Sequence, residues 1–182
     1  MRFYIIRADS VSMKKFIEFW SDQYDYGKED LYVNNIGKKL TENRIIALFE
    51  WKNGMRLSGP KLQSVRKNFI KNSDYLPKKT NIDLLRKFLN KPGGAIWLIF
   101  WLHCQRPEEY PIYDRNVHRA MASIKLWNEI EIPSSNRMKV EIYLDHYLPF
   151  WKEFSRFEAR KVDKALWSYG DFLGLEYEIS VV

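Results

Sequence analysis

The sequence has few cysteines and histidines and no long apolar segment. Its 182 residues include one cysteine, Cys104, so the chain cannot form an intramolecular disulfide, which fits a reducing compartment. The three histidines show no metal-ligand spacing with one another or with that cysteine, so the pattern indicates no metal site. The apolar run at residues 95–102 is far shorter than the about 20 residues that a membrane-spanning helix needs.

Several signals of catalysis and targeting are also missing. The sequence has no internal repeat, no glycine-rich phosphate loop of the GxxxxGK type and no Gly-x-Ser-x-Gly motif, so nucleotide hydrolysis and acyl transfer are unsupported. Residues 1–15 lack a continuous apolar stretch followed by a small-residue cleavage site. We therefore expect a cytoplasmic protein that has no membrane partner and uses no cofactor.

The chain does contain a large aromatic fraction and an excess of positive charge. Hydrophobic residues make up 46% of it, with 7 Trp, 11 Tyr and 11 Phe, which indicates a globular protein with a substantial core. The formal net charge of +7 favours a polyanionic partner, because the neutralisation of phosphates releases counterions. A merely solvated basic surface, or attraction to a membrane surface, would fit the same charge.

Apolar residues recur mainly at helical spacing, so the pattern predicts an all-α fold. The expected helices cover residues 12–20, 41–53, 60–71, 81–89, 115–128, 135–148 and 159–173. Two segments favour an extended conformation instead. One is a short piece at Leu31–Val33, and the other is the tail 174–182, whose alternating pattern would pair with Phe3–Ile6.

The length predicts one domain over residues 1–182, or two small helical lobes. The lobes would be a hairpin and core lobe, 41–120, and a second lobe, 1–40 plus 121–182. The last helical pattern, 159–173, is amphipathic and should pack its apolar face against the buried run 95–102.

Residues 95–102, AIWLIFWL, are apolar enough to be buried on all sides, as a helix or as a strand. Gly93 and Gly94 directly precede this run. A glycine pair at this place is either a plain loop or a tight turn that opens a helix, and the unpaired first amides of such a helix attract phosphate.

Asp114 stands immediately before a helical pattern that begins with Arg115 and continues through Val117 and Met121. Aspartate is a favoured residue at this N-cap position, where it contributes about 1 kcal/mol. The structural role is therefore sufficient by itself to explain an aspartate here.

The segment from Gly93 onward resembles the helix-hairpin-helix DNA glycosylase superfamily. In that family a glycine hairpin leads into a core helix and then into a run of proline, an apolar residue, any residue, aspartate, two further residues, valine, any residue and arginine. The matching residues are Pro111, Ile112, Asp114, Val117 and Arg119. A second, weaker resemblance to the family lies at residues 160–170. The resemblance implies a helix-hairpin-helix fold, double-stranded DNA as the partner, and Asp114 as the catalytic residue.

The sequence departs from the family pattern at three places, and these departures limit which kind of family member it resembles. The family hairpin usually reads L-P-G-V-G, and residues 90–94, NKPGG, keep part of it. Bifunctional members carry a nucleophilic lysine in the helix after the hairpin, but no lysine lies between Gly93 and Gln105, and Lys91 is the nearest alternative. Water would then be the nucleophile and the enzyme monofunctional. Cys104 stands alone, which excludes the four-cysteine iron–sulfur cluster of some members.

The resemblance also suggests residues that contact DNA. The candidates for phosphate contact are Lys91, Gly93, Gly94 and Arg115. The candidates for the base pocket, or for insertion into the duplex, are Tyr113, Trp97, Trp51 and Asn53. Tyr113 and Trp97 would equally suit the core, and residues 51–54 would equally form a helix end with an Asn-Gly turn.

We therefore expect a DNA glycosylase that acts as a monomer, hydrolyses the N-glycosidic bond of a damaged or modified base, and leaves an abasic site. The base would be flipped out of the duplex, and ionised Asp114 would stabilise the positive charge that develops on the sugar. Repair of a damaged base is compatible with this activity, and so is antiviral defence by removal of a hypermodified, glucosylated cytosine from phage DNA. The alternative is a non-catalytic helical DNA-binding protein in which Asp114 is only a cap.

Overall fold

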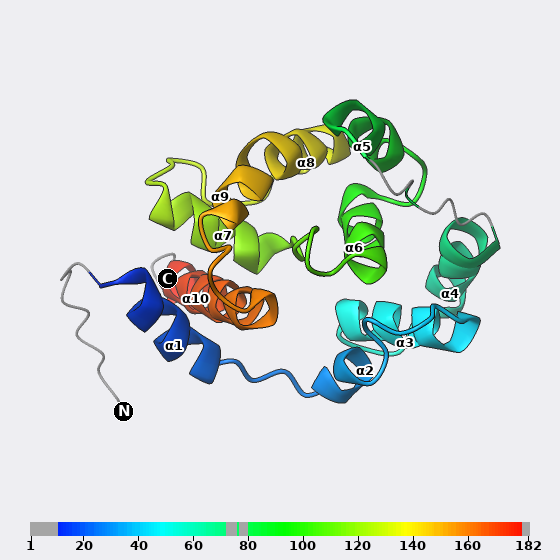
Figure 1. The fold of residues 1–182 in the computed structure, drawn as a ribbon, viewed down its shortest axis with the longest axis horizontal. Coiled ribbons are helices and arrows are strands. Elements are labelled where there is room, and N and C mark those ends of the chain that lie inside the picture. Colours follow the sequence, from blue (N-terminus) through cyan, green and yellow to red (C-terminus); the bar gives the residue numbers. More distant parts are fainter. Residues whose placement is uncertain (1–10, 72–75, 77–79, 180–182) are drawn as a thin grey trace.

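The described part of the chain folds into helices (Figure 1). The computed structural model describes residues 11–71, 76 and 80–179. The helices are α1 (Met13–Asp22), α2 (Glu29–Val33), α3 (Glu42–Asn53), α4 (Gly59–Val65), η1 (Arg66–Lys71), α5 (Ile82–Leu89), α6 (Ala95–Gln105), α7 (Arg115–Ile124), α8 (Asn136–Ile142), η2 (Tyr143–Tyr147), α9 (Leu148–Lys152) and α10 (Ala159–Ile179), where η marks a π-helical turn. None of the described residues forms a strand, so the prediction of an all-α fold is confirmed.

Side-chain caps fix where several helices begin. A polar side chain at the N-cap accepts the backbone N–H of the residue three positions later before α1, α5, α7 and α8, and these caps are Ser12, Asn81, Asp114 and Ser135. Each cap contributes about 1 kcal/mol, because it satisfies a backbone donor that the helix itself leaves unpaired. The cap predicted at Asp114 is therefore confirmed.

Helix α6 is the centre of the core, and 8 of its 11 residues are buried. Phe49 of α3 packs against Trp97 and Phe100 of this helix, with ring centroids 5.2 and 5.4 Å apart. The turn before α6 requires its glycines, because Gly93 and Gly94 have φ angles of 135° and 84°, a region that other residues rarely adopt. Of the two readings of the run 95–102, the buried helix is the correct one.

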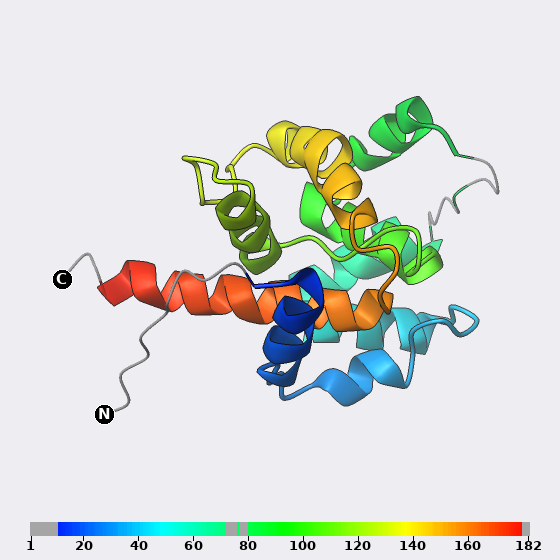
Figure 2. The ribbon, with the colours of Figure 1, turned by 60° about the vertical axis from the view of Figure 1, so that its left-hand side comes forward.

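Helix α10 packs mainly against α1 and α7, whereas the sequence suggested α6 as its main partner (Figure 2). Two glycines explain this choice of partner, since they let α7 approach the backbone of α10 closely. A Cβ atom at Gly170 would overlap the carbonyl group of Asn116, and one at Gly174 would overlap the guanidinium of Arg119. The predicted packing of this helix on the run 95–102 was therefore wrong.

Both expected extended segments are helical where the structure describes them. Leu31–Val33 belongs to α2, in which Tyr32 is buried, and residues 174–179 continue α10. A helix pairs its backbone groups within the segment, whereas an isolated strand would leave them without partners. Residues 180–182 and the proposed pairing partner Phe3–Ile6 lie outside the described residues.

The arrangement brings distant segments together around one point. The end of α3, the run before α7 and the first turns of α10 converge there, and the connection from α1 to α2 passes beside them (Figures 1 and 2). Among the described helices, none has both the length and the apolarity to cross a membrane.

Candidate active site

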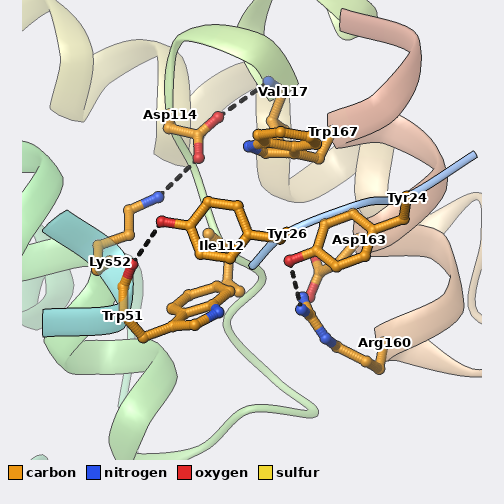
Figure 3. A pocket seen from close by; sticks show the side chains of 10 residues that line it. All are labelled: Tyr24, Tyr26, Trp51, Lys52, Ile112, Asp114, Val117, Arg160, Asp163 and Trp167. Carbon is orange, nitrogen blue, oxygen red and sulfur yellow. Dashed lines mark hydrogen bonds and ion pairs between the residues drawn. The ribbon is translucent and has the colours of Figure 1, made fainter. Parts of the chain in front are cut away.

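A small pocket lies where these four segments meet (Figure 3). Its lining residues are Tyr24, Tyr26, Trp51, Lys52, Ile112, Asp114, Val117, Arg160, Asp163 and Trp167. The pocket encloses about 60 Å³, which is enough for one or two water molecules. Ligand sites for small molecules usually start at about 300 Å³, so a nucleobase would need these walls to move apart.

Asp114 lies at the rim of the pocket and has both carboxylate oxygens engaged. One oxygen accepts the backbone N–H of Val117 at 3.1 Å, which is the cap of α7. The other accepts a hydrogen bond from the ammonium of Lys52 at 2.7 Å (Figure 3). These two bonds hold the carboxylate in one orientation. The Asp114 side chain is 22% exposed and still lines the pocket.

Lys52 is a site residue that the sequence analysis missed. Its side chain is only 8% exposed, and its ammonium lies 5.9 Å from the ring centre of Phe100. The resemblance places a nucleophilic lysine in the helix after the glycines, whereas Lys52 lies near the end of α3. Because its nitrogen is bonded to the Asp114 carboxylate, this lysine is not placed to act as a nucleophile.

Asp163 on α10 is the second carboxylate of the pocket, and it is almost entirely buried, with 3% exposure. Its Oδ1 atom has no hydrogen-bond partner within the described part of the chain. Burial raises the pKa of Asp163 from 3.8 to about 7, against the opposing effects of the charges on Arg160 and Lys52. The charge on Asp114 raises this pKa further.

Trp51 contributes a second unsatisfied polar atom to the same pocket. The residue is 6% exposed, and its indole Nε1–H has no acceptor among the described residues. Buried polar groups without partners are rare in folded proteins and often mark a position for water or a ligand. The pocket thus combines an unused donor on Trp51 with an unused oxygen on Asp163.

Arg160 anchors the wall of the pocket opposite Asp114. Its guanidinium donates to both carboxylate oxygens of Glu29 at 2.8 Å and to the hydroxyl of Tyr24 at 3.0 Å. It also lies over the rings of Tyr32 and Trp51, 4.3 and 5.3 Å from their centres. These contacts tie α10 to the segment that leads into α2.

That segment, residues 23–28, forms a strap across the pocket. The hydroxyl of Tyr26 donates to the backbone carbonyl of Trp51 at 2.6 Å, and the rings of Tyr24 and Tyr26 stack with centroids 6.2 Å apart. Trp167 meets both tyrosine rings edge-on. The strap is held by side-chain contacts that can break and reform without unfolding a helix.

The other residues predicted for the base pocket take different places. Tyr113 is fully buried and hydrogen-bonds the Nδ1 atom of His118 at 2.8 Å, and Trp97 packs on the core phenylalanines. The amide of Asn53 donates to the carbonyl of Met55 at 3.0 Å beyond the end of α3. Of the four aromatic and amide candidates, Trp51 alone lines the pocket.

The residues predicted for phosphate contact lie outside the pocket. Lys91 lines a separate hollow of about 300 Å³ beside the glycine turn, together with Lys67, Phe88 and Pro92. Gly93 and Gly94 form the turn itself, and Arg115 is exposed in the first turn of α7. The structure therefore separates the two lysines near the glycine turn from the pocket that contains the two carboxylates.

A sequence signal for Asp163 did exist. It lies among Val162, Ala165 and Leu166, within the apolar stripe of the last helix. Charged residues are seldom buried in such a stripe, and those that are often belong to functional sites. Lys52 had no comparable signal, because a lysine at the end of a helix is usually solvated. The pocket also draws side chains from both ranges expected as lobes.

No group of three metal-binding side chains comes together within the residues that the structure describes. No protein-family model, curated protein or solved structure matches this chain.

Proposed function

We propose that this protein is a monofunctional DNA glycosylase with Asp114 as its central catalytic residue. The observation that carries the proposal is the pocket itself: it is lined by Asp114, which a helix cap and an ion pair hold in place, by the buried carboxylate of Asp163 and by aromatic side chains. The reaction adds water to the C1′ carbon of the sugar while the bond from C1′ to the base nitrogen breaks. An abasic site and the free base are the products.

Asp114 suits the stabilisation of a sugar cation. Cleavage of a glycosidic bond develops positive charge on the sugar ring, and a fixed carboxylate lowers the energy of that state without having to reorient. Its contacts with Val117 and Lys52 supply the fixation. In the free protein the ammonium of Lys52 is the countercharge of the Asp114 carboxylate, so neither group of the pair lacks an ionic partner.

The aromatic walls suit a flipped nucleotide. A base gains about 1–3 kcal/mol from stacking on an aromatic side chain, which offsets the few kcal/mol needed to unstack it from the duplex. Tyr26, Trp51 and Trp167 are the available surfaces. Because the closed pocket encloses about 60 Å³, entry of a base requires that the strap swing away and break the bond between Tyr26 and Trp51.

The basic surface near the hairpin suits the DNA backbone. Lys91 and Lys67 lie beside the glycine turn, whose amides open α6, and Arg115 follows the catalytic aspartate directly. If about four phosphates are neutralised, the log–log slope of affinity against salt should be near −3.6. A slope near zero would reject DNA binding.

The decisive experiment is incubation of the purified protein with duplexes that each carry one altered base, followed by alkali to cleave abasic sites. The panel covers oxidised, alkylated, mismatched and deaminated bases, together with phage DNA that contains glucosylated hydroxymethylcytosine. Breaks that form only after alkali, and that vanish in Asp114→Asn, support the proposal and identify the base. Excision limited to the glucosylated base assigns antiviral defence, whereas excision of a damaged base assigns repair.

A second candidate function is non-catalytic DNA binding, and one observation favours it. Both oxygens of Asp114 are already satisfied by structural partners, so its cap role needs no chemistry. Salt-sensitive binding that persists in Asp114→Ala, with no product from the wild-type protein on any substrate, would establish this alternative.

A further inference from the structure

We propose that Asp163 is a second catalytic residue, the base that takes the proton from the attacking water. This assignment rests on the proposed glycosylase function and goes beyond it, because it divides the chemistry between two carboxylates. Asp114 stabilises the charge on the sugar, and Asp163 activates the nucleophile.

The hydrogen bonds of the two carboxylates indicate this division. Each oxygen of Asp114 already accepts a strong donor, the amide of Val117 or the ammonium of Lys52. Oδ1 of Asp163 accepts none within the described chain, although the residue is only 3% exposed. An oxygen that is shielded from bulk solvent and still free is well placed to accept a proton from a bound water.

The pocket also offers that water a place and a second contact. Its volume of about 60 Å³ suits one or two water molecules and is too small for a larger ligand. Trp51 lines the same pocket, and its indole N–H has no acceptor among the described residues. A water that donates to Asp163 and accepts from Trp51 would satisfy both orphaned atoms and point a lone pair into the pocket.

The chemical step balances with water as the only co-reactant. The water oxygen forms a bond to C1′, and the bond from C1′ to the base nitrogen breaks with its electron pair leaving on that nitrogen. One water proton moves to the Asp163 carboxylate, while the other stays on the new hydroxyl. The carboxyl of Asp163 then passes this proton to the base nitrogen, directly or through a water molecule, which returns Asp163 to its ionised form.

The charges around Asp163 make its protonation state responsive near neutral pH. Burial raises its pKa to about 7, which is where a general base serves an enzyme best. The titratable and charged groups that influence it come from every neighbouring element, and they are Arg160 on its own helix, Lys52 on α3, Asp114 before α7, Tyr32 on α2, and Tyr143 and Tyr147 on η2. Excision should therefore rise with pH as Asp163 ionises.

The test compares Asp163→Asn with the wild-type protein in single-turnover excision of the base that the panel identifies, at several values between about pH 5 and pH 9. The asparagine keeps the size of the side chain and removes the base. We expect a loss of about 100-fold, with DNA affinity unchanged and with the rise of the rate through about pH 7 absent. Asp171→Asn is the matched control on the same helix, since Asp171 is exposed and lies outside the pocket, and the asparagine oxygen can still accept the hydrogen bond that Asn116 donates at 3.1 Å.

Three results would overturn the inference, and each is distinct. Excision by Asp163→Asn within threefold of wild type, with the same pH profile, rejects Asp163 as the base but leaves the glycosylase proposal standing. A flat wild-type profile rejects it as well, and this measurement does not depend on whether the variant folds. Absence of any product from wild type on the whole panel rejects the glycosylase proposal and, with it, this step.

Discussion

The two carboxylates of the pocket have the same side chain and opposite surroundings. Asp114 stands at a helix start with an ammonium at 2.7 Å and a backbone amide at 3.1 Å, and it is partly exposed. Asp163 lies within a helix, is 3% exposed, and keeps one oxygen without a partner. The difference shows how position alone leaves one aspartate with both oxygens bonded, whereas burial raises the pKa of the other to about 7.

The same comparison separates stability from function. The contacts of Asp114 stabilise the fold, because a cap and an ion pair both favour the native helix. Burial of Asp163 works against the fold above neutral pH, because its charged form loses hydration that its neighbours do not replace. Strongly perturbed groups of this kind gather at functional sites, where activity outweighs their cost in stability.

The largest expected effect comes from removal of the fixed charge. We expect Asp114→Asn to lower single-turnover excision by about 1000-fold, because the sugar cation loses its fixed countercharge. The amide oxygen can still cap α7, but the ammonium of Lys52, whose side chain is 8% exposed, loses its countercharge, so the melting temperature should fall by several degrees. The charge of Asp114 raises the pKa of Asp163, so the residual rate should rise at lower pH than in wild type.

A residual rate that loses its pH dependence altogether would contradict this division of labour, since the pH response would then belong to Asp114. Full retention of activity in Asp114→Asn would remove the catalytic role itself.

The next largest effect concerns stability against pH. The folded-state pKa of Asp163 is raised from 3.8 to about 7, so its contribution to stability is fully present below about pH 4 and is lost as pH rises to about 7. At about 1.4 kcal/mol per pKa unit, the loss amounts to a few kcal/mol. We expect Asp163→Asn to be more stable than wild type above about pH 7, with the difference shrinking or reversing toward about pH 4.

Urea denaturation of both proteins across this range measures the effect, and Asp171→Asn serves again as the control for loss of one negative charge. A constant difference between Asp163→Asn and wild type at all pH values would show that Asp163 has no raised pKa.

An intermediate effect comes from Lys52. We expect Lys52→Met to lower the free energy of unfolding by about 1–3 kcal/mol, because methionine fills the buried space but leaves Asp114 without its countercharge. Lys61→Met is the control, since Lys61 is exposed and donates to the side chain of Asn53, and it should change stability by less than about 0.5 kcal/mol. Equal losses in both variants would mean that the pair with Asp114 contributes little.

Lys52 also sharpens the comparison of the two carboxylates. Its charge lowers the pKa of Asp163, so its removal should move the rise of excision to higher pH, opposite to the shift in Asp114→Asn. The pair of shifts in opposite directions would identify Asp163 as the titrating group without mutation of that residue.

Local patterns in the sequence were sufficient to predict the elements that depend on neighbours in the chain. The apolar run 95–102 predicted a buried element, its glycines predicted the turn, and Asp114 was identified as a cap, because each depends on a few consecutive residues. The extended tail was wrong for residues 174–179, since an alternating pattern has no strand partner to confirm it. Residues 174–179 form the last turns of α10 instead.

The pocket itself depends on contacts that local patterns do not contain. Lys52 meets Asp114 across 62 residues of sequence, and Arg160 meets Glu29 across 131. The second pair depends on the packing of α10 against α7 and α1, which its glycines permit and which the apolar stripe alone did not predict. A charged residue inside that stripe was the available clue to Asp163.

The smallest expected effect tests the strap that separates the two carboxylates from solvent. Tyr26→Phe removes the hydrogen bond of 2.6 Å to the carbonyl of Trp51 and should cost about 0.5–1.5 kcal/mol of stability. If opening of the strap admits the base, this loss favours the open form and speeds single-turnover excision by up to about fivefold. Tyr169→Phe is the control, because it removes a hydroxyl contact with Ser123 at 3.0 Å outside the pocket. A faster rate in the Tyr26 variant alone assigns the gate to the strap, while equal rates in the two variants mean that the base enters by another path.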